Sequence, residues 1–151
     1  MLKTILVPVD ASDQKDAVLH QAVEITRNFG GTLHLVAVHD INQLWEAKMP
    51  EPPPEIFDSL EEETRARLEA AQKQVQEWGM ASEGHFLEGP VTEQISLLAG
   101  QINADLIVMG HRQMSKLRRL LKNSAAKGLI DESPCSVMIV REHKGATEEG
   151  Q

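Results

Sequence analysis

A single glycine followed by a run of cations has the composition of an anion-binding segment. Gly110 closes the apolar stretch DLIVMG, and the chain from His111 to Lys127 then carries basic residues and no acid. A glycine lets backbone N–H groups approach a phosphate, and basic side chains neutralise its charge. The alternative is a solvated helix face that pairs with the protein's own acids. The cations are Arg112, Lys116, Arg118, Arg119, Lys122 and Lys127.

A second candidate segment, PVDAS at Pro8–Ser12, follows the first apolar run. Ligands of doubly wound sheets bind beyond the carboxyl ends of the strands, where the winding reverses. If the first strand lies next to the fourth, Pro8–Ser12 and the loop Met109–Gln113 face each other across one crevice. Val38 and His39 would then form a side wall. The sequence does not fix this strand order, so the geometry is conditional.

Other reactive side chains are not spaced for catalysis or for metal binding. The six histidines show no metal-ligand spacing with one another or with Cys135. Ser124 has no evident base partner, which leaves nucleophilic catalysis without support. The paired acids, phospho-accepting aspartate and late lysine of a response regulator are also missing from the expected places. We therefore expect a protein that is not an enzyme and has no metal site.

The elements that position these residues alternate along the chain. Five apolar runs predict strands, and four segments with apolar residues at helical spacing predict helices. We expect Phe29 to be buried on the first helix with Val18, Ala22 and Ile25. This order predicts a doubly wound α/β domain, with a five-stranded parallel sheet covered by helices on both faces. The predicted strands are 4–10, 32–40, 81–89, 104–110 and 135–142, and the predicted helices follow Ser12 or Asp13, span 55–78, follow Pro90 and span 116–132.

Length, charge and cysteine content narrow the class further. The 151 residues fit a single domain, which we place at 1–142, with a polar tail at 143–151. A net charge of -8 argues against nucleic acid and anionic membranes as partners. A single cysteine, no signal peptide and no membrane-spanning run favour a cytoplasmic location.

Four segments together resemble the universal stress protein family. They are ILVPVDAS, EGPVTEQI, DLIVMGHR and SPCSVMIV, and the resemblance covers about residues 3–141. It implies a Rossmann-like sheet of strand order 3-2-1-4-5 and a role in stress response. It also implies a homodimer, usually paired through the last strand, here Val137, Met138, Ile139 and Val140.

Members of that family that bind ATP carry Gly-x-x-Gly, nine residues, then Gly-Ser or Gly-Thr. Gly110 matches the first glycine, Gln113 replaces the second, and Asn123-Ser124 stands in place of Gly-Ser. Gln113 adds bulk where a phosphate needs close approach, whereas Asn tolerates the left-handed region. Arg112 and Lys116 could compensate by clamping phosphate oxygens.

The resemblance and the loop together favour a homodimeric stress-response binding or signalling module with a degenerate nucleotide loop. One alternative is a member that binds ATP or AMP, with Mg²⁺, and hydrolyses ATP slowly at most. Another is a dimeric module whose basic helix 116–127 docks an acidic protein surface. A retained nucleotide site would consist of Pro8, Val9, Asp10, Ser12, Val38, Met109, Gly110, Arg112, Gln113, Lys116, Asn123, Ser124 and Ala125.

Overall fold

The structure is a computed structural model that describes residues 2–11, 15–40, 53–120 and 135–141. For residues 116–120 it describes the backbone only. Strands and helices alternate as the sequence predicts. In chain order they are β1 (Thr4–Pro8), α1 (Lys15–Phe29), β2 (Thr32–His39), α3 (Pro54–Glu77), β3 (Ser82–Glu88), α4 (Val91–Gln101), β4 (Leu106–Gly110), α5 (His111–Leu120) and β5 (Ser136–Val140).

The five strands form one sheet in the order β3-β2-β1-β4-β5, and all of their pairings are parallel. The predicted fold class and the strand order implied by the family resemblance are both confirmed. From β1 the chain winds outward through β2 to β3, and it then returns to β4 on the other side of β1. The winding therefore reverses between β1 and β4, which is where doubly wound sheets bind ligands.

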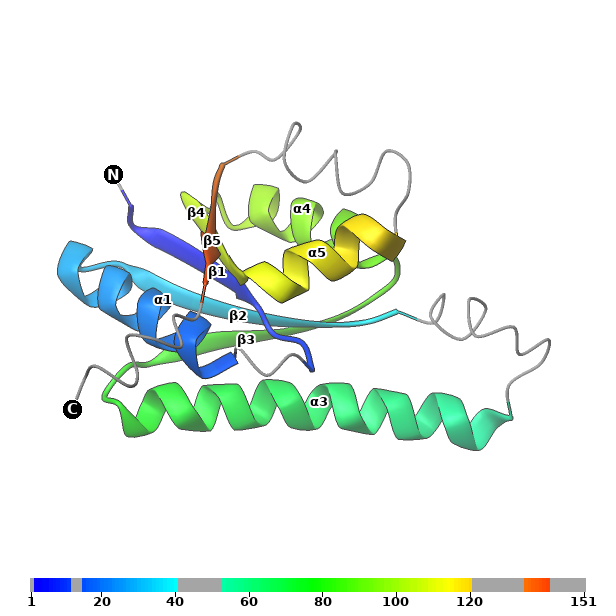
Figure 1. Cartoon of the computed structure of the whole chain (residues 1–151). Coiled ribbons are helices and arrows are strands. Elements are labelled where there is room, and N and C mark those ends of the chain that lie inside the picture. The colour runs from blue at the N-terminus through cyan, green and yellow to red at the C-terminus, as the bar shows by residue number, and fades with distance from the viewer. Residues whose placement is uncertain (1, 12–14, 41–52, 121–134, 142–151) are drawn as a thin grey trace.

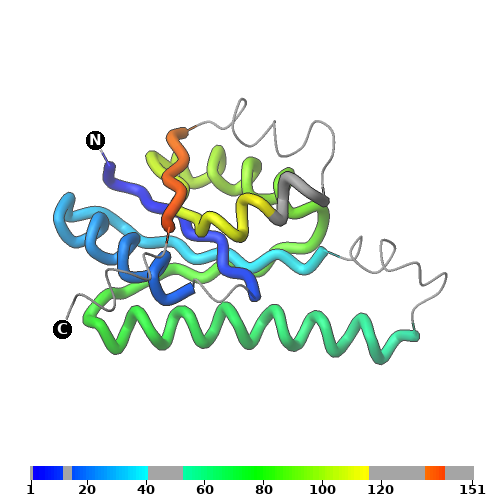
Figure 2. Tube along the Cα trace, viewed as in Figure 1, coloured from blue at the N-terminus to red at the C-terminus, as the bar shows by residue number. Residues whose placement is uncertain are grey.

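Helices cover both faces of the sheet. Helices α1 and α3 pack on one face, and α4 and α5 pack on the other (Figures 1 and 2). Successive side chains of a strand point to opposite faces, so each central strand serves both cores. In β1, Ile5 and Val7 belong to the core under α1 and α3, and Leu6 belongs to the core under α4. Strand β4 is buried along its whole length.

The predicted burial of Phe29 is wrong. Val18, Ala22 and Ile25 are buried as expected, but the side chain of Phe29 is 45% exposed. Phe29 has the helical spacing of the buried residues, but it is the last residue of α1. The chain leaves the helix through Gly30 at a φ of 62°, and the Lys3 ammonium donates a hydrogen bond to the Phe29 carbonyl. The helix end is therefore held by its backbone, and the ring stays partly in solvent.

A carboxylate joins the starts of β1 and β4. Asp105 Oδ2 accepts hydrogen bonds from the backbone N–H groups of Thr4, at 2.8 Å, and of Lys3, at 3.0 Å. The Asp105 N–H in turn donates to the Thr4 carbonyl at 2.8 Å. The bonds from Thr4 and Lys3 stabilise the charged form and lower the pKa of Asp105 below its usual value of 3.8.

This contact predicts a specific acid response. Because the folded-state pKa of Asp105 is depressed, its contribution to stability is present above pH 3.8 and is lost as the pH falls through the folded pKa. In a ¹³C NMR titration, the Asp105 carboxyl should titrate below its usual value. The unfolding free energy of Asp105→Asn should fall less steeply than that of the wild type in this acid range. A midpoint at or above 3.8 would show that the two backbone bonds do not favour the carboxylate.

Candidate functional site

A crevice opens where β1 and β2 end. It has a volume of about 140 Å³, and the residues that line it include Pro8, Val9, Asp10 and Val38. The Val9 N–H donates to the Val36 carbonyl at 2.7 Å, which extends the β1–β2 pairing past Pro8 and fixes the position of Asp10. Small-molecule sites typically measure about 300–1,000 Å³, so this crevice by itself has room for only part of a nucleotide.

A larger hollow adjoins the crevice between α1 and α3. Its volume is about 560 Å³, and it shares Val9, Asp10, Ala11 and Arg67 with the crevice. Asp10 therefore borders both spaces. The two volumes together reach the size of ordinary small-molecule sites.

The side chain of Gln113 spans the gap between β1 and β4. Its Nε2 donates to the Pro8 carbonyl at 3.1 Å, and its Oε1 accepts from the Gly110 N–H at 3.3 Å. The residue is 7% exposed and lines the crevice. The Gly110 N–H, at the start of a helix, is the kind of donor that binds a phosphate oxygen. Here the Gln113 amide accepts from it instead, so a phosphate at this point would have to displace that amide.

The predicted loop Met109–Gln113 and the predicted helix start at Lys116 are both wrong. Gly110 is the last residue of β4, and α5 begins at His111. Gln113 lies three residues after Gly110, and its side chain reaches back to the Gly110 N–H as the glutamine of a capping box does. This bond caps the helix at its first turn. The Gly110–Gln113 spacing was the sequence signal for it.

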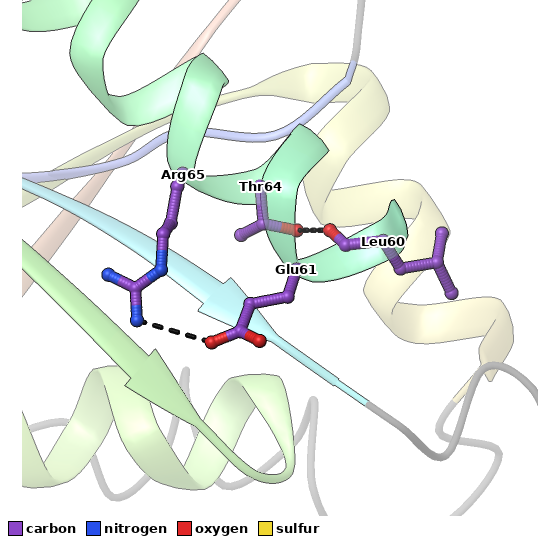
Figure 3. A network of polar contacts seen from close by, with 4 residues as sticks. All are labelled: Leu60, Glu61, Thr64 and Arg65. Atoms are coloured by element: carbon purple, nitrogen blue, oxygen red, sulfur yellow. Dashed lines mark hydrogen bonds and ion pairs between the residues drawn. The ribbon is translucent and has the colours of Figure 1, made fainter. Parts of the chain in front are cut away.

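Helix α3 supplies a wall of the crevice that the sequence did not predict. Leu60, Thr64 and Arg67 lie on one side of α3 at helical spacing and line the crevice. The Thr64 hydroxyl donates to the Leu60 carbonyl at 2.8 Å (Figure 3). Arg67 Nη2 lies 3.7 Å from Glu63 Oε2 in an exposed ion pair. The guanidinium of Arg67 is at the mouth of the site.

The neighbouring residue Arg65 serves the packing of α3 and not the crevice. Its Nη2 donates to Glu61 Oε1 at 3.2 Å (Figure 3), and its guanidinium lies 3.8 Å from the centre of the Phe86 ring on β3. A cation over an aromatic face attaches the helix to the edge of the sheet. The wall formed by Leu60, Thr64 and Arg67 is thereby held over the carboxyl ends of the strands.

The predicted nucleotide residues fall into three groups. The structure brings Pro8, Val9, Asp10, Val38 and Gln113 together at the crevice. Met109 and Gly110 are buried at the end of β4, and Arg112 is exposed on the first turn of α5. The predictions for Ser12, Asn123, Ser124, Ala125 and the side chain of Lys116 lie outside the described residues, as does the prediction that the basic face of 116–127 docks a protein.

The predicted dimer strand is the last strand of the sheet. Strand β5 pairs with β4 on one side, and on its other side it pairs with no strand of the described ranges. Val137, Met138 and Val140 are partly buried, and Ile139 is 39% exposed. An open edge with apolar side chains can pair with another chain.

In the described part of the protein, no helix is long and apolar enough to span a bilayer.

The fold is a doubly wound α/β domain with a crevice at the reversal of its winding. A sequence model of the universal stress protein family matches residues 1–141. The chain belongs to the universal stress protein family, as the resemblance of its four segments implied.

Known relatives agree with this assignment. A universal stress protein of Thermus aquaticus is 32% identical over 93% of this chain and 100% of its own length. One from Methanocaldococcus jannaschii is 29% identical over 95% of this chain and 85% of its own length. Among solved structures, a universal stress protein family member from Burkholderia pseudomallei has a TM-score of 0.70 and 28% identity, covering 92% of this chain and 96% of its own.

A more distant structure was solved with a nucleotide. It is a universal stress protein from Archaeoglobus fulgidus in complex with dAMP, and it superposes with a TM-score of 0.62 at 23% identity, covering 92% of this chain and 98% of its own. At this identity the likeness supports the shared fold.

Proposed function

We propose that this universal stress protein is a non-catalytic binding module of the cytoplasm that takes the adenosine part of an adenine nucleotide and gains little from a triphosphate. The observation that carries the proposal is the position of Gln113. Its amide uses the Gly110 N–H and the Pro8 carbonyl, which lie at the reversal of the winding. The adenosine side of the crevice, around Val9, Asp10 and Val38, makes no hydrogen bond with Gln113 among the described contacts.

The chemistry of the lining residues supports an adenosine ligand. Val9 and Val38 offer apolar contact for a base, and Asp10 offers a carboxylate that can accept from ribose hydroxyl groups. Arg67 at the mouth can meet one phosphate group. The dAMP complex of the Archaeoglobus fulgidus protein agrees with a nucleoside monophosphate as the ligand of this fold.

Binding of a triphosphate at this site would cost free energy. Displacing the Gln113 amide breaks two hydrogen bonds, each worth about 0.5–1.5 kcal/mol, so the penalty is roughly fivefold to 150-fold in affinity. A γ-phosphate held this poorly is not positioned for attack by water, because phosphoryl transfer depends on positioning. The proposal is therefore a binding and signalling role without efficient hydrolysis.

The experiment is a titration of the wild-type chain with AMP, followed by ¹H–¹⁵N NMR. Saturable shifts should appear at Val9, Asp10 and Val38, and Asp10→Ala should weaken AMP binding by about tenfold, which corresponds to one lost charged hydrogen bond. Asp58→Ala, which removes an exposed carboxylate of α3, serves as the matched control and should leave the affinity unchanged. Equal AMP affinity in Asp10→Ala and the wild type would place the nucleotide elsewhere and overturn the proposal.

A further inference from the structure

Two histidines and a glutamate converge at the edge of the sheet, away from the crevice. His34 lies on β2, and Glu83 and His85 lie on the neighbouring strand β3. Their ligand atoms all lie within 4.8 Å of one another. His34 precedes Val38 by four residues, which places it roughly 13 Å from the crevice along the strand. None of the three residues lines the crevice.

The strand register brings the three side chains together. His34 is paired with Glu83, and Val36, two residues further along, is paired with His85. Residues two apart on a strand share a face, so His34 lies on the same face as Val36, which belongs to the core under α4. Glu83 and His85 share this face by the same alternation. The positions of the three side chains are thus set by the backbone pairing of two rigid strands.

The distances fit a metal ion nearly as they stand. His34 Nδ1 lies 3.0 Å from His85 Nε2 and 3.2 Å from Glu83 Oε2. Ligand atoms bound to Zn²⁺ at about 2.0–2.1 Å in a tetrahedron are separated by about 3.4 Å. The two distances from His34 Nδ1 are thus within a few tenths of an ångström of those in a zinc site, and the third, between Glu83 and His85, is within 4.8 Å.

The number of hydrogens available between the three side chains also favours a cation. Between the facing nitrogens of two neutral imidazoles, one hydrogen can form the bond, and the Glu83 carboxylate brings none. Once one nitrogen carries that hydrogen, the other nitrogen and the carboxylate oxygen are two acceptors that face a single donor. A divalent ion in place of the hydrogen, with both rings neutral, can accept a lone pair from each of the three atoms.

We propose that His34, Glu83 and His85 bind a divalent transition-metal ion of the Zn²⁺ class. Two imidazoles and one carboxylate are the donors that such ions prefer, whereas Mg²⁺ and Ca²⁺ prefer oxygen ligands. His34 is 7% exposed and fixes one ligand, while the Glu83 side chain is 67% exposed and gives the ion a path from solvent. With three protein ligands, a fourth position is open for water or for a side chain of another molecule.

The test is a calorimetric titration of the full chain, treated with a chelator and dialysed, with ZnCl₂. The wild type should bind one ion with a Kd of about 10 μM or tighter, and both His85→Gln and Glu83→Gln should bind at least about tenfold more weakly. His20→Gln removes an exposed imidazole of α1, which packs on the opposite face of the sheet from the cluster, and should bind as the wild type does.

A second readout identifies the ligands directly. On addition of Zn²⁺, the ¹⁵N resonances of the His34 and His85 rings should shift, and those of His20 should not. Because Glu83 is exposed, Glu83→Gln should fold even if a histidine variant does not, as thermal unfolding would show. Absence of heat up to about 1 mM zinc, or equal affinity in the wild type and Glu83→Gln, would overturn the proposal and leave a hydrogen-bonded histidine pair.

Discussion

Gln113→Gly combined with Asn123→Gly is expected to tighten MgATP binding by about tenfold or more. The first change removes the amide that occupies the Gly110 N–H and the Pro8 carbonyl, and frees both for a ligand. It also restores the glycine pattern of family members that bind ATP. The gain follows from clearing the side chain from the path of a phosphate, together with the two hydrogen bonds that the phosphate no longer has to displace, each worth about 1 kcal/mol. Calorimetry with MgATP on the wild type and the double variant measures it.

Gln113→Met is the matched control for this prediction. Methionine keeps the bulk of glutamine but can make neither hydrogen bond, so the approach of a phosphate should stay blocked and the affinity for MgATP should stay low. Both variants lose the bond that caps α5, which costs about 1 kcal/mol of stability and is seen in thermal unfolding. A gain in Gln113→Met equal to that of the double variant would show that bulk is not the obstruction.

Ile139→Lys is expected to convert a dimer into a monomer. The family resemblance implies pairing through β5, and Ile139 is an exposed apolar side chain of that strand. A lysine buried in an interface without a partner costs about 2 kcal/mol or more, or at least about thirtyfold in the dimer dissociation constant. Sedimentation velocity over a range of concentrations would detect this change.

Leu97→Lys provides the control for the dimer prediction. Leu97 is 53% exposed on α4, so the change introduces the same charge at another exposed apolar position. That variant should sediment as the wild type does. A wild-type chain that is monomeric at all concentrations, or an Ile139→Lys chain that stays dimeric, would rule out β5 as the dimer strand.

The architecture was predictable because burial follows simple periodicity. Strand β4 is buried along its whole length, and its continuous apolar run could be read as a two-faced buried strand. The order of the strands in the sheet could not be predicted in this way, because apolar runs do not indicate which strand lies beside which. That part came from the family resemblance, and the pairing of β1 with both β2 and β4 confirms it.

The local structure at Gly110 was missed because two readings competed for the same residues. The family pattern treated Gly110 and Gln113 as positions of a phosphate loop, whereas the structure uses them as the two ends of a helix cap. The carbonyl partner of Gln113, Pro8, is 105 residues away in the chain. A contact of that kind depends on the strand order and has no local sequence signal.

The histidine cluster shows the same limit. His34 and His85 are 51 residues apart, far outside the short spacings that mark metal ligands in a sequence. Only the register of β2 against β3 brings them within 3.0 Å.

The wall that α3 forms could not be predicted from the sequence either. Leu60, Thr64 and Arg67 have the spacing of ordinary positions in an amphipathic helix, and only the placement of the helix over the strand ends makes them part of the crevice.

The most direct test of the central claim compares MgATP with AMP in calorimetric titrations of the wild-type chain. If Gln113 closes the phosphate side of the crevice, AMP should bind, and MgATP should bind no tighter than AMP, because a triphosphate either displaces the Gln113 amide or leaves its extra phosphates without productive contact. Binding of MgATP about tenfold or more tighter than AMP would contradict the account. It would mean that the Gln113 amide yields to a triphosphate and that this protein retains the nucleotide loop in a different form.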